Sequence, residues 1–300
     1  MKKMSVFIIL ALLLCAQCPS EASFFAEQKQ KFEQTRFKKA ENAEIKDVFS
    51  KMTKYANKHD LDGVKSLFAK DFTNSDGFNL DTYVDMIKET WATYPDISYS
   101  TQIYYVDFSD NYARVVTTES AVAISKEQIG LIEAIGELNS VSMCIYTLEK
   151  HGTKWLVSSE HVIDETSTLK YGGARYMNIV LDTPKQIGAN KQYTVTLKAD
   201  IPKGCNAIAS IGTEKIIYPQ TKAEDNFRRI TNESGLERVF TSNGDNVNEY
   251  AVASVGLAQI PAENARFDMS KNGLAFIITR VNVIPKNKFI ETKMRVKNNE

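Results

Sequence analysis

Hydrophobic and polar residues alternate with a period of two through two neighbouring runs between residues 140 and 166. Such alternation is typical of half-buried β-strands, and the turn sequence His151-Gly152-Thr153 between the runs predicts that they form a hairpin. Four residues of the second run occupy every second position and are expected to share one face of the sheet: Trp155, Val157, Ser159 and His161. We expect this hairpin to close an antiparallel sheet.

Apolar residues recur at helical spacing before this sheet. The positions from Ile45 to Ala56 predict a first amphipathic helix. Asp60 or Asp62 can cap a short second helix, and Asn79 can cap a third. The folded part of the chain is therefore expected to open with three helices.

Strand-like runs follow at Ile97–Phe108 and Tyr112–Ile124. Helices followed by strands of one antiparallel sheet indicate an α+β fold, because hairpins replace the helical crossovers that a parallel sheet requires. The segment Lys126–Asn139 has isoleucines at three-residue steps and predicts a short amphipathic helix between two strands. That helix would either cover the mouth of a pocket or pack on the surface as an insertion.

Beyond Lys170 the pattern changes to short β-rich runs separated by Gly, Pro, Asn and Asp. About seven such runs, spaced by roughly ten residues, predict an all-β sandwich. The stretch Tyr171–Ala174 is the expected hinge. The expected parts of the chain are a charged lead-in at 23–42, an α+β domain at 43–170, a β-sandwich domain at 174–286 and a polar tail at 287–300.

The first 22 residues have the three parts of a secretory signal peptide. Lys2 and Lys3 supply positive charge, Val6–Leu14 is apolar, and small residues allow cleavage after Ala22. The apolar part is shorter than the roughly 20 residues that a membrane-spanning helix needs. We therefore expect export to the periplasm or the extracellular space, with membrane association only if this segment is retained or lipidated.

Cys15 and Cys18 raise the question of a lipid anchor. Bacterial lipidation follows a pattern with a small residue just before the modified cysteine, whereas Leu14 and Gln17 stand at those positions here. Soluble export is therefore favoured over lipidation.

The amino-acid composition mainly excludes certain classes of function. Hydrophobic residues make up 43% of the chain, as is typical of globular proteins, and 37 basic residues balance 37 acidic ones. A balanced charge creates no global field for nucleic acid, so we expect no nucleic-acid partner. Cys144 and Cys205 lie in different expected domains and are predicted to be two buried thiols rather than a disulfide. They form no CxxC pair, and neither a metal nor another cofactor is expected.

Three stretches in a fixed order resemble the nuclear-transport-factor-2-like superfamily, which includes ketosteroid isomerases and polyketide-cyclase-like proteins. They are KHDLDGVKSLFAKDF, TNSDG and GTKWLVSSEHV. The resemblance covers residues 43–166 and implies an α+β cone, in which three helices lie on a curved antiparallel sheet. Members of this superfamily hold small, often apolar ligands between the helices and the sheet, and they include both enzymes and binding or assembly modules.

The resemblance also implies a candidate base. Asp76 lies in TNSDG, which is similar to the segment that bears the general base of the isomerases. A carboxylate beside an apolar pocket is suited to proton transfer. Met52 and Val141 stand at the positions of the isomerase tyrosine and acid, so the isomerase set is incomplete. Asp76 is therefore favoured as a turn residue or helix cap.

His161 is a second catalytic candidate, because imidazole can give and take a proton near neutral pH. The alternative is a half-buried histidine held by its strand neighbours. Acid–base chemistry would require Asp76 and His161 to converge across the cone. The expected ligand pocket comprises Tyr55, Trp91, Tyr104, Glu119, Tyr146, Ser159 and His161. Aromatic residues at such spacings also commonly form a core.

These observations favour an exported protein that binds a small apolar molecule or a protein partner without catalysis. The alternative is a lyase or isomerase that acts on a small apolar substrate through Asp76 and His161. A third interpretation is a structural module that forms a homodimer through the open face of the N-terminal sheet. The amino-acid sequence leaves all three open.

Overall fold

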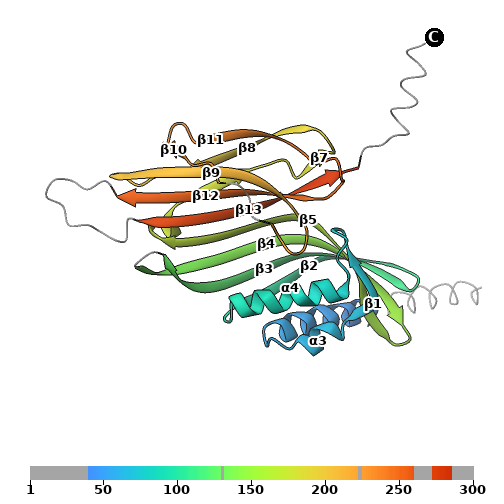
Figure 1. The fold of residues 1–300 in the computed structure, drawn as a ribbon. Helices are drawn as coiled ribbons and strands as arrows, with labels where there is room; N and C mark the ends of the chain where they lie inside the picture. Colours follow the sequence, from blue (N-terminus) through green and yellow to red (C-terminus); the bar gives the residue numbers. More distant parts are fainter. Residues whose placement is uncertain (1–39, 130–131, 222–224, 260–271, 286–300) are drawn as a thin grey trace, which may run out of the picture. The chain divides into compact units, whose positions relative to one another are not determined.

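The computed structural model describes residues 40–129, 132–221, 225–259 and 272–285, most of which lie in β-strands (Figure 1). The chain divides into two compact units, residues 1–47 and 48–300. Residues 40–47, the described part of the first unit, are helical. The expected signal peptide, nearly all of the lead-in and the polar tail lie outside the described residues. In the described ranges, no helix is long and apolar enough to cross a membrane.

The second unit begins with helical segments, and the two later ones are capped at their starts as the sequence predicts. The helical segments are residues 48–56, α3 (Leu61–Lys65) and α4 (Leu80–Thr93). The side chain of Asp60 accepts a hydrogen bond from the Gly63 amide, and that of Asn79 accepts one from the Thr82 amide. Each satisfies a backbone N–H that a helix start leaves without a partner. The caps predicted at Asp60 and Asn79 are confirmed.

Ten strands of the described ranges form one continuous sheet. Eight of them follow one another in the order β10 (Arg228–Ile230), β9 (Cys205–Lys215), β12 (Glu249–Gln259), β13 (Gly273–Ile284), β5 (Lys154–Gly172), β4 (Ile132–His151), β3 (Tyr112–Ile129) and β2 (Ser98–Ser109). In addition, β1 (Phe68–Asn74) pairs with β5, and β7 (Gln186–Gly188) pairs with β13. A smaller sheet has the order β11 (Leu236–Thr241), β8 (Gln192–Ala199) and β6 (Ile179–Asp182).

β5 connects the two halves of the large sheet. It pairs with β1 and β4, and its last part pairs with β13, from Thr166 opposite Thr279 to Gly172 opposite Gly273. The expected separate sandwich after a hinge at Tyr171–Ala174 therefore differs from the structure, in which β13, β12 and β9 extend the same sheet. Turn residues in the sequence indicate where the chain bends, but they do not specify which strands pair.

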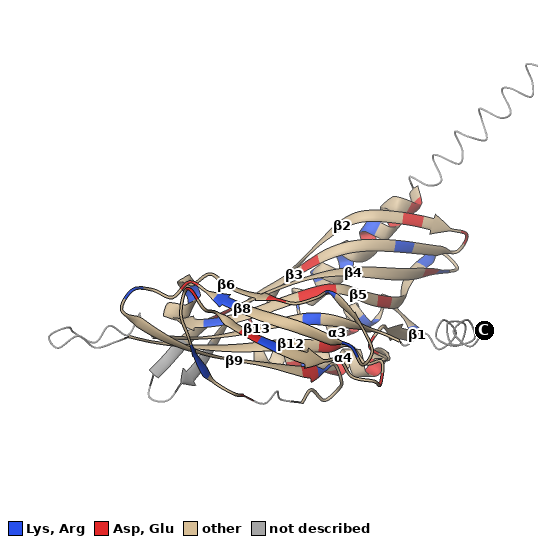
Figure 2. Ribbon diagram, turned by 90° about the horizontal axis from the view of Figure 1, so that it is seen from above, with Lys and Arg blue, Asp and Glu red and all other residues tan. Residues whose placement is uncertain are grey.

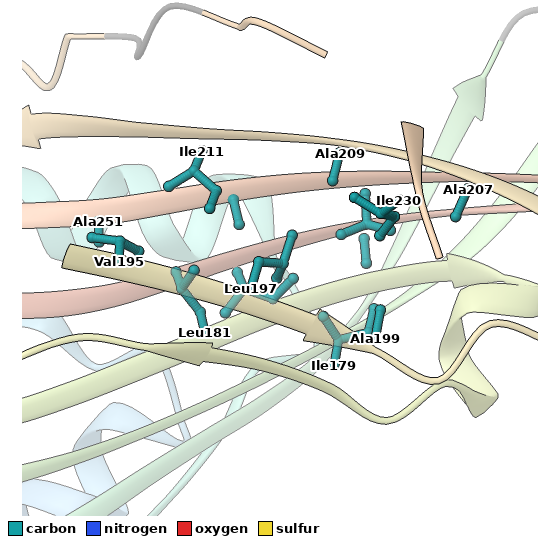
Figure 3. Packing of buried hydrophobic residues seen from close by; sticks show 14 of the residues in the cluster. Ile179, Leu181, Val195, Leu197, Ala199, Ala207, Ala209, Ile211, Ile230 and Ala251 are labelled. Carbon is teal, nitrogen blue, oxygen red and sulfur yellow. The ribbon is translucent and has the colours of Figure 1, made fainter. Parts of the chain in front are cut away.

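A hydrophobic core lies between the smaller sheet and β9, β12 and β13 of the large sheet. Figure 3 shows side chains of this core gathered between the two layers of strands. Val195 and Leu197 come from the smaller sheet, and Ala209, Ile211 and Ala251 come from the large one. All five are fully buried. The two layers share one core, and one of the layers is part of the ten-stranded sheet.

The segment Lys126–Asn139 is not a helix, contrary to the prediction. β3 and β4 remain paired along it, with Lys126 opposite Ile135 and Ile129 opposite Ile132. Isoleucines at three-residue steps fit a helix, but β-branched residues also favour strands, and the pairing of two long strands decides the outcome. Residues 130–131 lie outside the described ranges. The suggested helical cover of a pocket mouth is absent from the rest of this segment.

The hairpin of β4 and β5 is confirmed. Its turn contains Gly152 with a φ of +64°, a conformation that glycine adopts without steric cost. Trp155 and Val157 follow the turn and are both buried, as the alternation predicts.

A β-bulge then changes which residues of β5 face inward. Val157 and Ser159 pair with neighbouring residues of β4, so Ser158 between them is an extra residue in the strand. Beyond the bulge the alternation is reversed, with Glu160 buried and His161 exposed. The prediction that His161 shares a face with Val157 is therefore wrong, because the extra residue turns the side chains that follow it to the opposite face, up to the next register shift at Ile163.

Charged residues are spread over the folded elements. Figure 2 shows basic and acidic positions interspersed along the strands of the large sheet. This distribution agrees with the equal numbers of basic and acidic residues in the sequence.

The two cysteines of the described ranges, Cys144 and Cys205, are not joined by a disulfide. The prediction of two thiols is confirmed, although Cys205 is only partly buried.

Candidate functional site

A cavity of about 230 Å³ lies between the helices and one face of the large sheet. We call this face, which carries Glu119, Tyr146 and Glu160, the inner face. The helical side of the cavity is mostly apolar and includes Met52, Thr53, Ala56, Val64, Ile87 and Trp91. The sheet side is more polar and includes Tyr99, Thr101, Glu119, Ser140, Ser142 and Tyr146. A ligand in this cavity would meet one apolar wall and one polar wall.

Strand pairing places Glu119 on the sheet side of the cavity. This residue of β3 lies opposite Thr101 of β2 and opposite Ser142 of β4. The Thr117 hydroxyl donates a hydrogen bond to Glu119 Oε1 at 3.3 Å. Burial raises the pKa of Glu119, and hydrogen bonds from Tyr146 and Thr117 offset only part of that rise. The carboxyl group therefore holds its proton more readily than an exposed glutamate does.

A second carboxyl group, that of Glu160, contacts the cavity wall through Tyr146. The buried Tyr146 hydroxyl donates a hydrogen bond to Glu160 Oε1 at 2.9 Å. Burial, followed by the charge of Glu119, raises the pKa of Glu160 to about 8, although the hydrogen bond from Tyr146 opposes the rise. Two carboxyl groups that repel each other inside a protein do not both ionise readily, so the pair retains a proton near neutral pH. We call Glu119 and Glu160 the cavity acids.

Aromatic rings form much of the cavity wall, namely those of Phe68, Tyr83, Trp91, Tyr99 and Tyr146. Trp91 also stacks on His59, with ring centres 4.7 Å apart. The Trp91 indole N–H is buried and forms no hydrogen bond with the described residues, although the Tyr99 hydroxyl is close enough to interact with it. Burial raises the pKa of Tyr83, which therefore stays a neutral phenol. No lysine, arginine or histidine is among the described residues that line the cavity.

Some of the predicted pocket residues line this cavity and others do not. Those in its wall are Trp91, Glu119 and Tyr146. Tyr104 is 59% exposed on β2, and His161 is exposed on β5 beyond the bulge. Tyr55 and Ser159 are partly buried but do not belong to the wall.

Asp76 lies in the turn after β1 and does not line the cavity. It forms an ion pair with Arg280 of β13, and the Asp76 and Arg280 side chains are only 4% and 1% exposed. The Asn248 side-chain amide donates a hydrogen bond to the same Asp76 oxygen at 2.7 Å. The structure therefore does not bring Asp76 and His161 together in the cavity, since Asp76 is held by these partners and His161 is exposed.

Asp76 belongs to a group of partly or fully buried polar residues that we call the junction network: Asp76, Glu165, Asn248, Tyr250, Arg280 and Asn282. The Tyr250 hydroxyl donates to Glu165 Oε2 at 3.0 Å, and Arg280 Nε donates to Asn282 Oδ1 at 2.9 Å. Burial raises the pKa of Glu165, and the charge of Arg280 counteracts that rise. The network joins the turn after β1 to β5, β12 and β13.

Within the described ranges, no group of three or more His, Cys, Asp or Glu residues could hold a metal ion.

Sequence reasoning missed Glu160 and the role of Tyr83 and Tyr99 in the cavity wall. Strict alternation from Trp155 places Glu160 on the outer face, and only the bulge reverses this. An available signal was the odd spacing between Val157 and the next apolar residue of the strand, Val162, because it indicates a change of phase.

No family model and no curated protein sequence matches the chain. Solved structures match part of it. The chain is similar to a provisionally identified scytalone dehydratase of Novosphingobium aromaticivorans DSM 12444, with a TM-score of 0.37 and 17% identity over 43% of this chain and 86% of that one. It is also similar to the type 3 hexachlorocyclohexane dehydrochlorinase of Novosphingobium barchaimii LL02, with a TM-score of 0.34 and 13% identity over 42% of this chain and 86% of that one.

A third similar structure is a provisionally identified dehydratase of the nuclear-transport-factor-2-like family from Streptomyces avermitilis. Its TM-score is 0.34 and its identity is 11%, over 41% of this chain and 96% of that one. Structural similarity at this level does not support an argument about function. The function proposed below therefore rests on the geometry of the cavity.

Proposed function

We propose that the protein binds a small, largely apolar molecule in the cavity between the helices and the inner face. The observation that carries this proposal is a cavity of about 230 Å³ with an apolar helical wall opposite a wall that offers Glu119 and several hydroxyl groups. Binding sites for small molecules commonly combine apolar surface with a few polar groups that fix the orientation of the ligand. The same architecture supports our proposal that residues 48–170, which make up most of the expected α+β domain at 43–170, form a cone of helices on a sheet like that of nuclear-transport-factor-2-like proteins.

The test is to fill the cavity. Ala121→Met adds a longer side chain to a lining residue of β3, whereas Val239→Met changes a residue of β11 that is 60% exposed. We expect the small alcohol 3,3-dimethyl-1-butanol to bind the wild type and Val239→Met equally, and to bind Ala121→Met roughly tenfold more weakly or not at all. Calorimetric titration measures the three affinities. Equal affinity of the alcohol for all three proteins would contradict the proposal.

A second candidate function, a lyase or isomerase reaction, is favoured by one observation: the pKa of Glu119 is raised and its carboxyl group lines the cavity. A carboxyl group with a raised pKa is a stronger proton acceptor than an ordinary glutamate. Mass spectrometry of molecules that co-purify with the wild type and with Glu119→Gln separates the two functions. A binding protein yields the same molecule from both, whereas an enzyme yields substrate from the variant and product from the wild type.

We further propose that the protein self-associates through the outer face of β3 and β4. This face exposes a group of apolar side chains, each 39% to 50% exposed: Val122, Ile124, Val141 and Met143. Exposed apolar groups of this kind on neighbouring strands favour contact with a second copy. We expect Val141→Lys to reduce the mass in solution from dimer to monomer, measured by light scattering. A wild-type protein that is monomeric at high concentration contradicts this proposal.

We also propose that the chain is exported and cleaved after Ala22. The support is the charged and apolar pattern of its first residues. The intact mass of the exported protein should correspond to a chain that starts at Ser23. A mass that includes Met1–Ala22, or an added lipid, contradicts it.

A further inference from the structure

The cavity acids are surrounded by groups that do not balance their charge. The charged groups that act on Glu160 are Glu119, Asp76 and Glu165, all of them acidic. Glu119 receives a hydrogen bond from the Thr117 hydroxyl, which is uncharged. A buried carboxylate without a counter-charge is costly, so this site favours either a bound proton or a cation from outside the protein.

The other walls of the cavity are suited to a cation. A ring face attracts a positive charge electrostatically, and Trp and Tyr are the strongest side chains in this respect. Tyr83, Trp91 and Tyr99 contribute to the cavity lining together with Glu119. Aromatic rings combined with one carboxyl group are the chemistry by which proteins recognise substituted ammonium ions.

We propose that the ligand of this cavity is a small organic cation of the class that carries an alkylated ammonium group. Glu119 balances the ammonium charge, and the aromatic rings of the lining surround it. This inference rests on the proposed function, because it names the class of molecule that the same cavity binds.

Binding of such a cation is coupled to the release of protons. The titratable groups around the cavity acids are Tyr83 of α4, Tyr99 of β2, Cys144 and Tyr146 of β4, Glu165 of β5, and Asp76 with its partner Arg280. The lining residues of helix 48–56, α3 and β1 include none. Burial raises the pKa of the phenols and of the thiol, so they stay neutral while the cavity acids ionise. Affinity for the cation therefore increases as the pH rises through about 8, where Glu160 loses its proton.

Choline and 3,3-dimethyl-1-butanol test the inference, because they share a hydroxyl group and a shape and differ in the positive charge. We expect the wild type to bind choline roughly tenfold more tightly than the alcohol at pH 8. Calorimetry in two buffers with different ionisation enthalpies should show proton release for choline alone. Glu119→Gln should lower the affinity for choline to that for the alcohol, whereas the control Glu237→Gln, at an exposed position of β11, should change neither.

A wild type that binds the alcohol as tightly as choline overturns the inference and leaves the proposed function standing. A wild type that binds neither molecule, with Ala121→Met indistinguishable from it, overturns both. Circular dichroism checks that each variant is folded.

Discussion

The junction network and the cavity acids are two groups of buried acidic side chains attached to the same sheet, and they differ in the origin of their counter-charge. Asp76 is paired with Arg280 and also accepts a hydrogen bond from Asn248. Glu119 and Glu160 have hydroxyl partners and repel each other. A buried carboxylate that the protein itself neutralises ties elements together, whereas one that it leaves unbalanced beside a cavity depends on a proton or a ligand.

The largest expected effect comes from removing the cation of the junction network. Arg280→Met leaves Asp76 buried without its counter-charge and should lower the free energy of unfolding by about 3–5 kcal/mol. Urea unfolding measures the loss. Adding Asp76→Asn to this variant removes the unbalanced charge and should restore part of the stability. A double variant that is as unstable as the sum of the two single variants would show that the two residues are not coupled.

The cavity acids should instead make the free energy of unfolding depend on pH. Glu160 ionises near pH 8 in the folded protein and near its ordinary pKa of 4.5 in the unfolded chain, so the folded state binds more protons between these values. The stability that this proton supplies is present below about pH 4.5 and is lost as the pH rises through 8, by at most about 1.4 kcal/mol per pH unit. Unfolding by urea at several pH values should show this decline in the wild type.

Glu160→Gln cannot ionise and should abolish the part of the decline that Glu160 causes. Glu237→Gln, at an exposed position, is the matched control and should retain it. Arg280→Met should also retain it, because that residue balances the other group of acids. If the stability of Glu160→Gln declines with pH as steeply as that of the wild type, the distinction between the cavity acids and the junction network is wrong.

The smallest and most direct comparison uses one matched change in each group. Tyr146→Phe removes the hydrogen bond to Glu160, and Tyr250→Phe removes the one to Glu165. Each should cost about 1–2 kcal/mol of stability in urea unfolding. Tyr146→Phe should also raise the pKa of Glu160 further, because the lost bond lowers it, and should change the affinity for choline. If Tyr250→Phe changes that affinity as strongly, the cavity and the junction do not act separately.

Local features of the fold could be predicted from the sequence. The caps at Asp60 and Asn79 and the turn at Gly152 depend on residues within a few positions of one another, and the corresponding helices and hairpin form as expected. The pairing of β5 with β13 could not be predicted, because about a hundred residues separate the paired positions and alternation identifies strands without identifying their neighbours. The isoleucines of Lys126–Asn139 fitted two periods, and strand pairing selected one of them.

The candidate site also contains some residues that could be predicted from the sequence and others that could not. Glu119 and Tyr146 lie on strands that alternate regularly, so the sequence could assign them to a pocket. Glu160 escaped prediction because an extra residue at Ser158 reverses the strand, and a bulge leaves little trace in composition. The partner of Asp76 also escaped it, because Arg280 lies far along the chain and the ion pair forms only when both halves of the sheet are in place.

The sharing of β5 between both halves of the sheet limits how this chain can be divided. A fragment that ends near residue 170 would separate the last part of β5 from β13 and expose a row of backbone N–H and C=O groups, which is a template for aggregation. The same fragment would lack Arg280 and leave Asp76 with a buried charge. The helical half is therefore not a transplantable module, and grafting its cavity onto another protein would require β13 to be carried along with it.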